Sequence, residues 1–335
     1  MKRPGNISMT LAGLLLTAAL AASCAKIRTM PDTTPQEIAM NPVASNITRT
    51  VTGPVSDGYP TEETMGIMAF YSEEEGTWNN GTEDVTEYIN KSEFKYNESY
   101  GMWAGWDGTK HSPHYWPLSG SLIFAGYSPF RNVEDEPIDD VSFDLQSKTL
   151  SISGYKADQS DLMYFLPRSD IYGNYVGVRG TDYNALFHHA LSLVVFTARA
   201  AKSDDIDYIR LKKIVLSDIV SAGDFSAQMS NVPNGNVTWI KASDASVSDC
   251  EVFAQVDDGG KTLSISPETI VEYLAIPMGT HDIIVEYSLI VNDKPHVESV
   301  NFKGQWETGK KYIYNLILGT ESIELDPQIT SDWGN

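Results

Sequence analysis

Residues 37–49, EIAMNPVASNITR, are the stretch on which the organisation of the chain depends. Pro42 excludes the interior of an α-helix, and Asn46 and Thr48 disfavour helix, so the stretch is predicted to be an extended strand. Arg49 ends it with a basic residue that a trypsin-like protease could cut. Its apolar side chains are expected to pack into a sheet: Ile38, Met40, Val43, Ala44 and Ile47. Function depends on whether this strand stays in its own fold or is removed from it.

The first residues are predicted to be a signal peptide, residues 1–23. A positive start at Lys2 and Arg3 precedes an apolar run from 9 to 22, which is too short for a stable membrane span. The sequence Ala22-Ser23-Cys24 resembles the lipobox of bacterial lipoproteins. We therefore expect lipid on Cys24, which would tether the exported chain to a membrane by its N-terminus. The alternative is an ordinary signal peptide cut near Ala22.

Charge and cysteine content exclude several classes of protein. The chain of 335 residues has 24 Lys and Arg against 45 Asp and Glu, a formal charge of −21. Such an acidic chain is not expected to bind nucleic acid or an anionic membrane surface. The two cysteines are Cys24 and Cys250. If Cys24 carries lipid, Cys250 has no partner and a disulfide framework is excluded.

The pattern of strands and turns predicts an all-β protein. A polar tether, 24–36, precedes the 37–49 strand, and many short strands with Gly and Pro turns follow, as in β-sandwiches. The segment 73–106 reads as irregular and 186–199 as the longest strand, apolar on both faces. Residues 282–291 alternate most clearly. A polar break at 200–207 divides the rest into an N-terminal domain, 50–203, and a C-terminal domain, 204–335.

Catalytic and metal-binding patterns are scarce. The chain has no G-x-S-x-G, phosphate-binding glycine loop or H-E-x-x-H motif, so we expect neither an enzyme nor a cofactor. His188 and His189 lie on opposite faces of a predicted strand, so they are not expected to hold one metal ion. The acidic runs at 73–75 and 134–140 have no calcium-loop spacing and are interpreted as solvated loops.

A group of aromatic residues between positions 103 and 116 has two interpretations. Exposed indole and phenol rings could stack on sugars, whereas buried rings would serve core packing. The candidate glycan contacts are Trp103, Trp106, Tyr115 and Trp116.

Several stretches in order resemble the fimbrillin family. They are IAMNPVASNITR (38–49), YPTEETMGIMAFYS (59–72), HYWPLSGSLIFAGYSP (114–129), ALFHHALSLVVFTARA (185–200) and FKGQWETGKKYIYNLILGTESIELDPQITSDW (302–333). The resemblance implies a lipoprotein precursor of type V pili with two transthyretin-like β-sandwich domains in tandem. It also implies that an arginine-specific protease removes the N-terminal strand, here after Arg49. A donor strand of another subunit then fills the groove, in many members the C-terminal strand.

The leading hypothesis is therefore a non-enzymatic pilus (fimbria) subunit, delivered to the outer membrane as a lipoprotein and assembled at the cell surface. Its expected partners are other pilus subunits and the processing protease. The candidate apolar contacts of a C-terminal donor strand are Ile323, Leu325 and Ile329. The alternative is a pilus tip adhesin or a surface glycan-binding lipoprotein.

Overall fold

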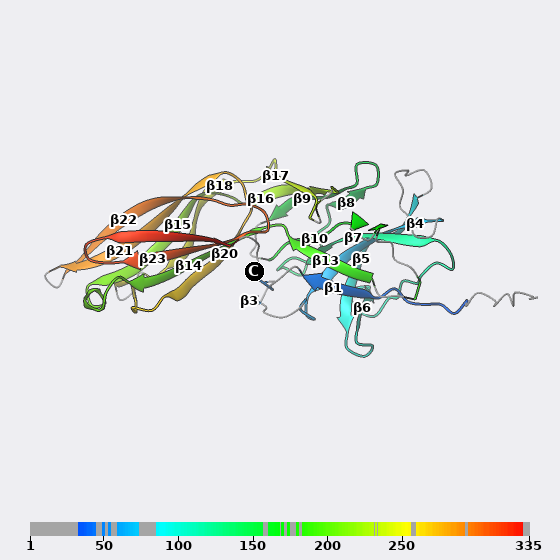
Figure 1. Cartoon of the computed structure of the whole chain (residues 1–335), viewed down its shortest axis with the longest axis horizontal. Coiled ribbons are helices and arrows are strands. Elements are labelled where there is room, and N and C mark those ends of the chain that lie inside the picture. Colours follow the sequence, from blue (N-terminus) through cyan, green and yellow to red (C-terminus); the bar gives the residue numbers. More distant parts are fainter. Residues whose placement is uncertain are drawn as a thin grey trace, which may run out of the picture. The chain divides into compact units, whose positions relative to one another are not determined.

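The structure, a computed structural model, is built of β-strands, which confirms the all-β prediction (Figure 1). The described part of the chain contains one short 3-10 helix, η1 (Ser203–Asp205), and no α-helix. No helix in this part has the length and apolarity of a membrane span. The structure describes residues 33–44, 49–50, 53–54, 59–73, 85–156, 160–167, 169–170, 173–174, 179–180, 183–230, 232, 234–255, 259–291 and 294–330.

Seven strands form a sheet that closes on itself, which we call the closed sheet. Its order is β1-β13-β10-β7-β4-β5-β6. These strands are β1 (Met40–Ala44), β4 (Thr64–Ser72), β5 (Val85–Asn97), β6 (Met102–Trp106), β7 (Ser121–Ser128), β10 (Met163–Phe165) and β13 (Tyr183–His189). Side chains alternate between its inside and outside, so Phe124 of β7 faces the enclosed core while Ile123 and Ala125 face another layer.

That other layer is a four-stranded sheet of order β17-β16-β9-β8. Its strands are β8 (Val141–Asp144), β9 (Thr149–Lys156), β16 (Ala222–Gln228) and β17 (Asn236–Lys241). Leu150, Ile152 and Phe225 from this layer share one buried cluster with Ile123 of β7. Every residue of β7 is buried because both of its faces are covered.

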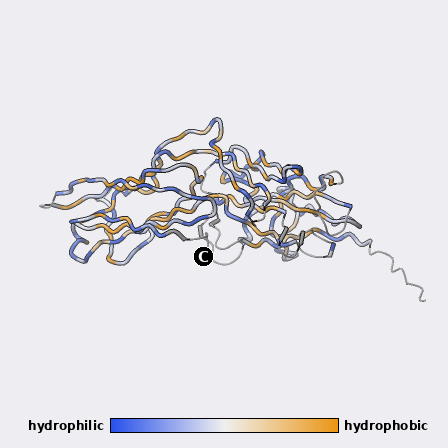
Figure 2. The backbone as a smooth tube through the Cα atoms, turned by 45° about the horizontal axis from the view of Figure 1, so that its top comes forward, coloured by the Kyte–Doolittle hydropathy of each residue, from blue (hydrophilic) through white to orange (hydrophobic). Residues whose placement is uncertain are grey.

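Two further sheets enclose a separate core. One has the order β20-β14-β23-β24, and the other has the order β18-β15-β21-β22, with β19 beside β15. The strands are β14 (Ser192–Ala200), β15 (Ile209–Val220), β18 (Val247–Ala254), β19 (Lys261–Thr262), β20 (Glu268–Ala275), β21 (Thr280–Val291), β22 (Lys294–Gln305), β23 (Lys311–Leu318) and β24 (Ile323–Thr330). In β21 the alternating residues Ile283, Val285 and Tyr287 enter this core, as their period of two predicts. Figure 2 shows hydrophobic and hydrophilic segments following one another along the strands.

Two predictions about strands were wrong. The segment 186–199 is not one strand but parts of β13 and β14, which belong to different sheets. The chain turns at Ala190 and Leu191, two fully buried apolar residues, which is why the hydrophobic run gives no local sign of the break. The segment 73–106, expected to be irregular, contains β5, a strand of 13 residues. Its outward face is polar and hides the alternation.

The polar break at 200–207 lies between β14 and β15, which contribute to the same core. Strands of the two predicted domain ranges also pair with each other: β14 pairs with β20 and β23, and β16 pairs with β9. Residues Pro35–Asn335 form one compact unit. Two short hairpins complete the described strands: β2 (Arg49–Thr50) with β3 (Gly53–Pro54), and β11 (Ser169–Asp170) with β12 (Gly173–Asn174).

Candidate functional site

The N-terminal strand β1 occupies the seam at which the closed sheet closes. It runs parallel to β13, with partners from Met40↔Tyr183 to Ala44↔Phe187. On its other side Met40 is the antiparallel partner of Trp103 in β6. Parallel neighbours are distant in the chain, and β1 reaches β13 across 143 residues at Asn41 and Asn184, whose side chains are joined by a hydrogen bond of 2.7 Å.

Backbone hydrogen bonds fix the residues just before β1. The Ile38 N–H donates to the His114 carbonyl at 2.8 Å, and the Trp116 N–H donates to the Gln36 carbonyl at 2.8 Å. On the opposite side the Tyr183 N–H donates to the Ala39 carbonyl at 3.0 Å. The segment therefore completes the ladders of two neighbours and would leave both with open edges if it departed.

Two side chains anchor the strand in the enclosed core. Ile38 is fully buried and Met40 is 3% exposed, and both belong to the cluster that Phe94 and Phe124 share. Val43 is 44% exposed, so the expectation that it packs inside was wrong. Successive side chains of a strand point to opposite faces, so Ile38 and Met40 point inward, whereas Val43, three residues after Met40, points outward.

A polar contact lies next to Ile38. Glu37 forms an isolated bridge with Tyr115, and its carboxylate Oε1 lies 2.5 Å from Nε2 of His111. His114, whose ring stacks on Phe94, is half-buried, and burial lowers its pKa while the Glu37 carboxylate opposes this shift. These partners of the strand could not be recognised from their positions in the sequence.

The proposed processing site follows β1 closely. Arg49 and Thr50 form the hairpin strand β2, with Arg49 opposite Pro54. The side chain of Arg49 and residues 45–48 lie outside the described residues, as do Cys24 and the signal peptide. Lipidation at Cys24 and cleavage at Arg49 therefore stay predictions.

The C-terminal candidate strand β24 lies at the edge of its own sheet, where it pairs with β23 alone. Ile323 and Leu325 are half-buried and pack against the second core. Ile329 pairs with Tyr312 through the backbone, and its side chain lies outside the described residues.

A signal in the sequence links the two strands and was missed. Residues 38–42 read Ile-Ala-Met-Asn-Pro and residues 323–327 read Ile-Glu-Leu-Asp-Pro. Both follow the same order of five positions: an apolar residue, any residue, an unbranched or γ-branched apolar residue, Asn or Asp, and proline. In both the proline lies in a strand with one neighbour at that point, where its missing N–H is tolerated.

The four candidate glycan contacts do not form one exposed surface. Trp103 and Trp116 are 6% and 5% exposed and belong to the enclosed core, where Trp103 meets Tyr59 edge-on at 4.9 Å. Trp106 is half-buried, and Tyr115 is 46% exposed. Two of the four rings therefore serve core packing.

Among the described residues no group of three or more His, Cys, Asp or Glu is arranged to hold a metal ion. His189 is buried and its Nδ1 lies 2.9 Å from Asp161 Oδ2, a contact inside the fold rather than at a surface. Cys250 is a free, half-buried cysteine.

Comparisons with known proteins give the family. The profile of the fimbrillin-like family matches residues 48–333. No curated protein matches the chain. A fimbrial protein from Bacteroides vulgatus ATCC 8482 has a similar structure, with a TM-score of 0.51 and 12% identity over 88% of this chain and 99% of that one. A candidate cell adhesion protein from Bacteroides ovatus ATCC 8483 has a TM-score of 0.51 and 15% identity, over 89% of this chain and 98% of that one.

The two structural neighbours establish a common fold, and the family profile covers most of the chain, including the closed sheet beyond β1 and all of the second core. The protein belongs to the fimbrillin-like family, and it is on these grounds a fimbrial subunit of the cell surface.

Proposed function

We propose that this chain is a non-enzymatic pilus subunit, exported as a lipoprotein precursor and assembled by donor-strand exchange. In the precursor β1 fills its own seam. A protease cuts after Arg49, β1 leaves, and β24 of another subunit takes its place. The observation that carries the proposal is the correspondence between Ile38-Ala-Met-Asn-Pro42 in the seam and Ile323-Glu-Leu-Asp-Pro327 at a sheet edge.

The contacts that hold β1 in the seam support the removal of the strand. Ile38 and Met40 contribute about 3–6 kcal/mol of burial at ~1.5–3 kcal/mol for each side chain, which is an upper value. Because residues 37–44 precede the rest of the closed sheet in the chain, a cut at Arg49 leaves them held by noncovalent contacts alone. Departure of β1 would open the edges of β13 and β6, and such edges bind an incoming strand by β-augmentation.

The position of β24 supports its role as donor. It has one neighbour, β23, and its large side chains Ile323 and Leu325 are half-buried rather than fully buried. Its transfer therefore costs its own subunit less than the loss of a central strand would. In the seam of a partner subunit, Ile323 would take the seat of Ile38, Leu325 that of Met40, and Asp326 would meet Asn184.

The predicted pair of transthyretin-like domains is part of the proposal. The closed sheet with the four-stranded sheet would form one domain, and the two sheets around the second core would form the other. β14 and the β16–β17 hairpin would then cross the boundary near residues 203–204, because each pairs with strands on the other side.

The test is Arg49→Ala in cells, with Arg28→Ala as the matched control, because Arg28 lies before the strand and its loss leaves the Arg49 site intact. We expect Arg49→Ala to remain an unprocessed monomer and Arg28→Ala to enter filaments. Arg49→Lys separates the proteases: a trypsin-like enzyme processes it, and an arginine-specific one does not. Normal entry of Arg49→Ala into filaments overturns the proposal.

Lipid attachment has its own test. The precursor should incorporate labelled palmitate, and Cys24→Ala should not. Wild-type protein that is unlabelled and free in the periplasm contradicts the lipoprotein step.

The alternative role, a tip adhesin or a glycan-binding surface lipoprotein, differs in where the protein lies. Immunogold labelling of sheared filaments with an antibody to this chain should label a shaft subunit along the filament. Labelling confined to filament ends assigns the tip instead, and labelling on no filament assigns a separate surface lipoprotein.

A further inference from the structure

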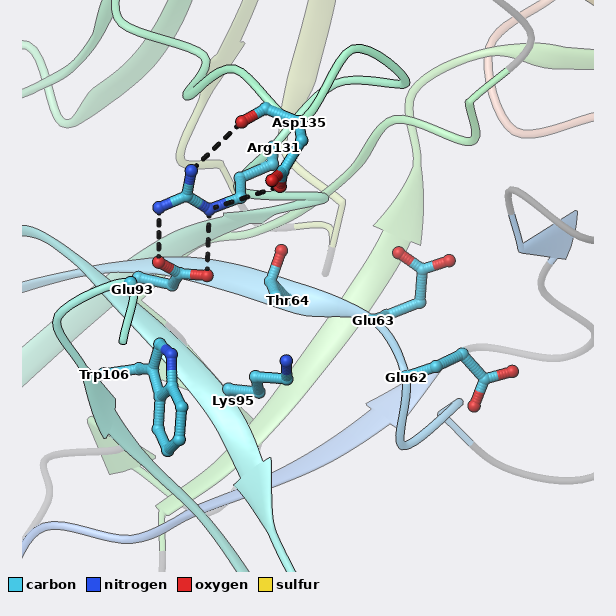
Figure 3. Close-up of a pocket in the computed structure, with 9 residues that line it drawn as sticks. Glu62, Glu63, Thr64, Glu93, Lys95, Trp106, Arg131 and Asp135 are labelled. Atoms are coloured by element: carbon cyan, nitrogen blue, oxygen red, sulfur yellow. Dashed lines mark hydrogen bonds and ion pairs between the residues drawn. The ribbon is translucent and has the colours of Figure 1, made fainter. Parts of the chain in front are cut away.

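A cavity of about 390 Å³ lies on the outer side of the closed sheet (Figure 3). It is bounded by the turn before β4, the strands β5 and β6, and the loop after β7. The residues that carry its chemistry are Glu62, Glu93, Lys95, Trp106, Arg131 and Asp135.

Strand alternation explains why these side chains gather outside the sheet. Phe94 is fully buried in the enclosed core, so its neighbours Glu93 and Lys95 project to the other face. Trp106 is the cross-strand partner of Glu93 and lies beside it on that face. The sheet therefore positions an indole ring, a carboxylate and an amine together.

The rear wall is preorganised. Glu93 is 6% exposed, and Arg131 donates to both of its oxygens, from Nη2 at 2.9 Å and from Nε at 3.2 Å. Arg131 also donates from Nη1 to the Asp135 carbonyl at 3.1 Å. Burying a carboxylate costs free energy. A two-point hydrogen-bonded partner offsets this cost and fixes the positions of both side chains.

The front of the cavity keeps free bonding capacity. The Lys95 amine lies over the Trp106 ring, 5.6 Å from its centre, in a cation–π contact that leaves its hydrogen-bonding capacity unused. Neither Lys95 nor the exposed Glu62 forms an ion pair with any residue that the structure describes. Figure 3 shows Lys95 directed toward the space between Trp106 and the glutamates.

We propose that this cavity binds a neutral saccharide unit, with an apolar face of the sugar ring against Trp106 and hydroxyls on Glu62, Lys95 and Asp135. Hydroxyls both donate and accept hydrogen bonds, so they satisfy carboxylates and an amine together. The lining has four carboxylates, including Glu63, against two cations, a net charge of −2, which disfavours an anionic ligand. The Lys95 amine beside the ring disfavours a cation. The volume falls in the range of small-ligand sites.

The residues of this site are distinct from those that strand exchange uses. None of them belongs to 37–49 or to β24, so the precursor and the processed chain both keep the residues that line the cavity. Failure of the exchange proposal therefore leaves this one standing, and the reverse also holds.

The experiment screens the purified full-length chain on an array of neutral, sialylated and sulfated glycans and measures the strongest neutral ligand by calorimetry. Trp106→Ala should weaken binding by at least about tenfold. Glu62→Gln, an exposed change that leaves the fold intact, should weaken it by a smaller factor. Tyr208→Ala removes a ring of 51% exposure outside the cavity and should bind as wild type.

Three results overturn the proposal: no neutral glycan binds, sialylated or sulfated glycans bind in preference, or Trp106→Ala and Glu62→Gln both bind as wild type. Near-UV circular dichroism of each variant separates loss of the site from loss of the fold.

Discussion

Met40 lies opposite Trp103 at the point where the N-terminal strand completes the closed sheet. Trp103 is 6% exposed and packs in the enclosed core with Tyr59, so the residue that seals the seam is itself part of the core. A strand that can be exchanged at this seam therefore changes the stability of the whole closed sheet, and not of one edge alone.

The first prediction concerns the buried anchor of β1. Ile38→Ala should lower the free energy of unfolding of the precursor by about 2–5 kcal/mol, because Ile38 is fully buried. Val43→Ala, at 44% exposure, is the matched control and should change it by less than about 0.5 kcal/mol. Urea denaturation of both variants measures the difference. Equal losses would mean that β1 does not occupy the seam as described.

The second prediction concerns the correspondence between the two strands. A peptide of residues 322–329 should bind the chain whose seam has been emptied by trypsin cleavage and separation of the β1 fragment, and not the intact precursor. A peptide with Leu325→Asp should bind at least about tenfold more weakly, because its carboxylate would enter the apolar seat of Met40. Asp326→Asn, which reproduces the native Asn41, is the control and should bind. Fluorescence anisotropy gives the affinities, and binding that ignores Leu325→Asp contradicts the register.

The third prediction concerns the ion pair behind the cavity. Arg131→Met should destabilise the chain by about 2–4 kcal/mol, because Glu93 would remain buried without a partner. Because the Arg131 side chain is 26% exposed, the loss in free energy of unfolding should lie in the lower part of this range. Adding Glu93→Leu to Arg131→Met should recover part of the loss, because the uncompensated charge is gone. If Glu93→Leu lowers the free energy of unfolding of the Arg131→Met variant as much as it lowers that of the wild type, the two residues are not coupled.

The fourth prediction concerns alkaline pH. Burial raises the pKa of Tyr59, Tyr127 and Tyr164 above that of an unfolded tyrosine, which is about 10. Above that pH the unfolded chain loses protons that the folded chain keeps, so the free energy of unfolding should fall as pH rises and be unaffected by these groups below it. Urea denaturation at a series of pH values measures the slope.

Tyr59→Phe is the control for the fourth prediction. It removes one titrating group and should reduce the slope by up to about 1.4 kcal/mol per pH unit. It also removes the hydrogen bond of 2.5 Å to Ser128, so the variant should be less stable at neutral pH. An unchanged slope would contradict the assignment to Tyr59.

The fifth prediction concerns Cys250. The purified lipidated precursor should contain one free thiol, which reacts slowly in the folded chain and fully after denaturation, because Cys250 is half-buried in β18. Mass shifts with a thiol reagent under non-reducing conditions count it. Two reactive thiols in one chain would mean that Cys24 carries no lipid, and a disulfide-linked dimer would mean either that Cys24 carries no lipid or that Cys250 bridges two chains.

The sequence by itself determined the all-β class and the fimbrillin-like family. Strand alternation is a local property, since the pleat sends successive side chains to opposite faces, and it is visible in 282–291 without any knowledge of the fold. The motifs of the family are local in the same sense. The repeated pattern at 38–42 and 323–327 was also present in the sequence, and it lacked meaning until the places of the two strands were known.

Tertiary structure alone decided which strands meet. The partner of Asn41 is 143 residues away, and no local pattern encodes a pairing at that distance. The entropy cost of closing a long loop varies slowly with its length, so loop length does not select one distant partner over another. The same reason explains why one apolar run divides into β13 and β14, and why Trp103 and Trp116 are buried while Trp106 lines a cavity. Glu93 and Arg131 are 38 residues apart and become a pair because β5 and the loop after β7 are brought together by the pairing of both strands with β4.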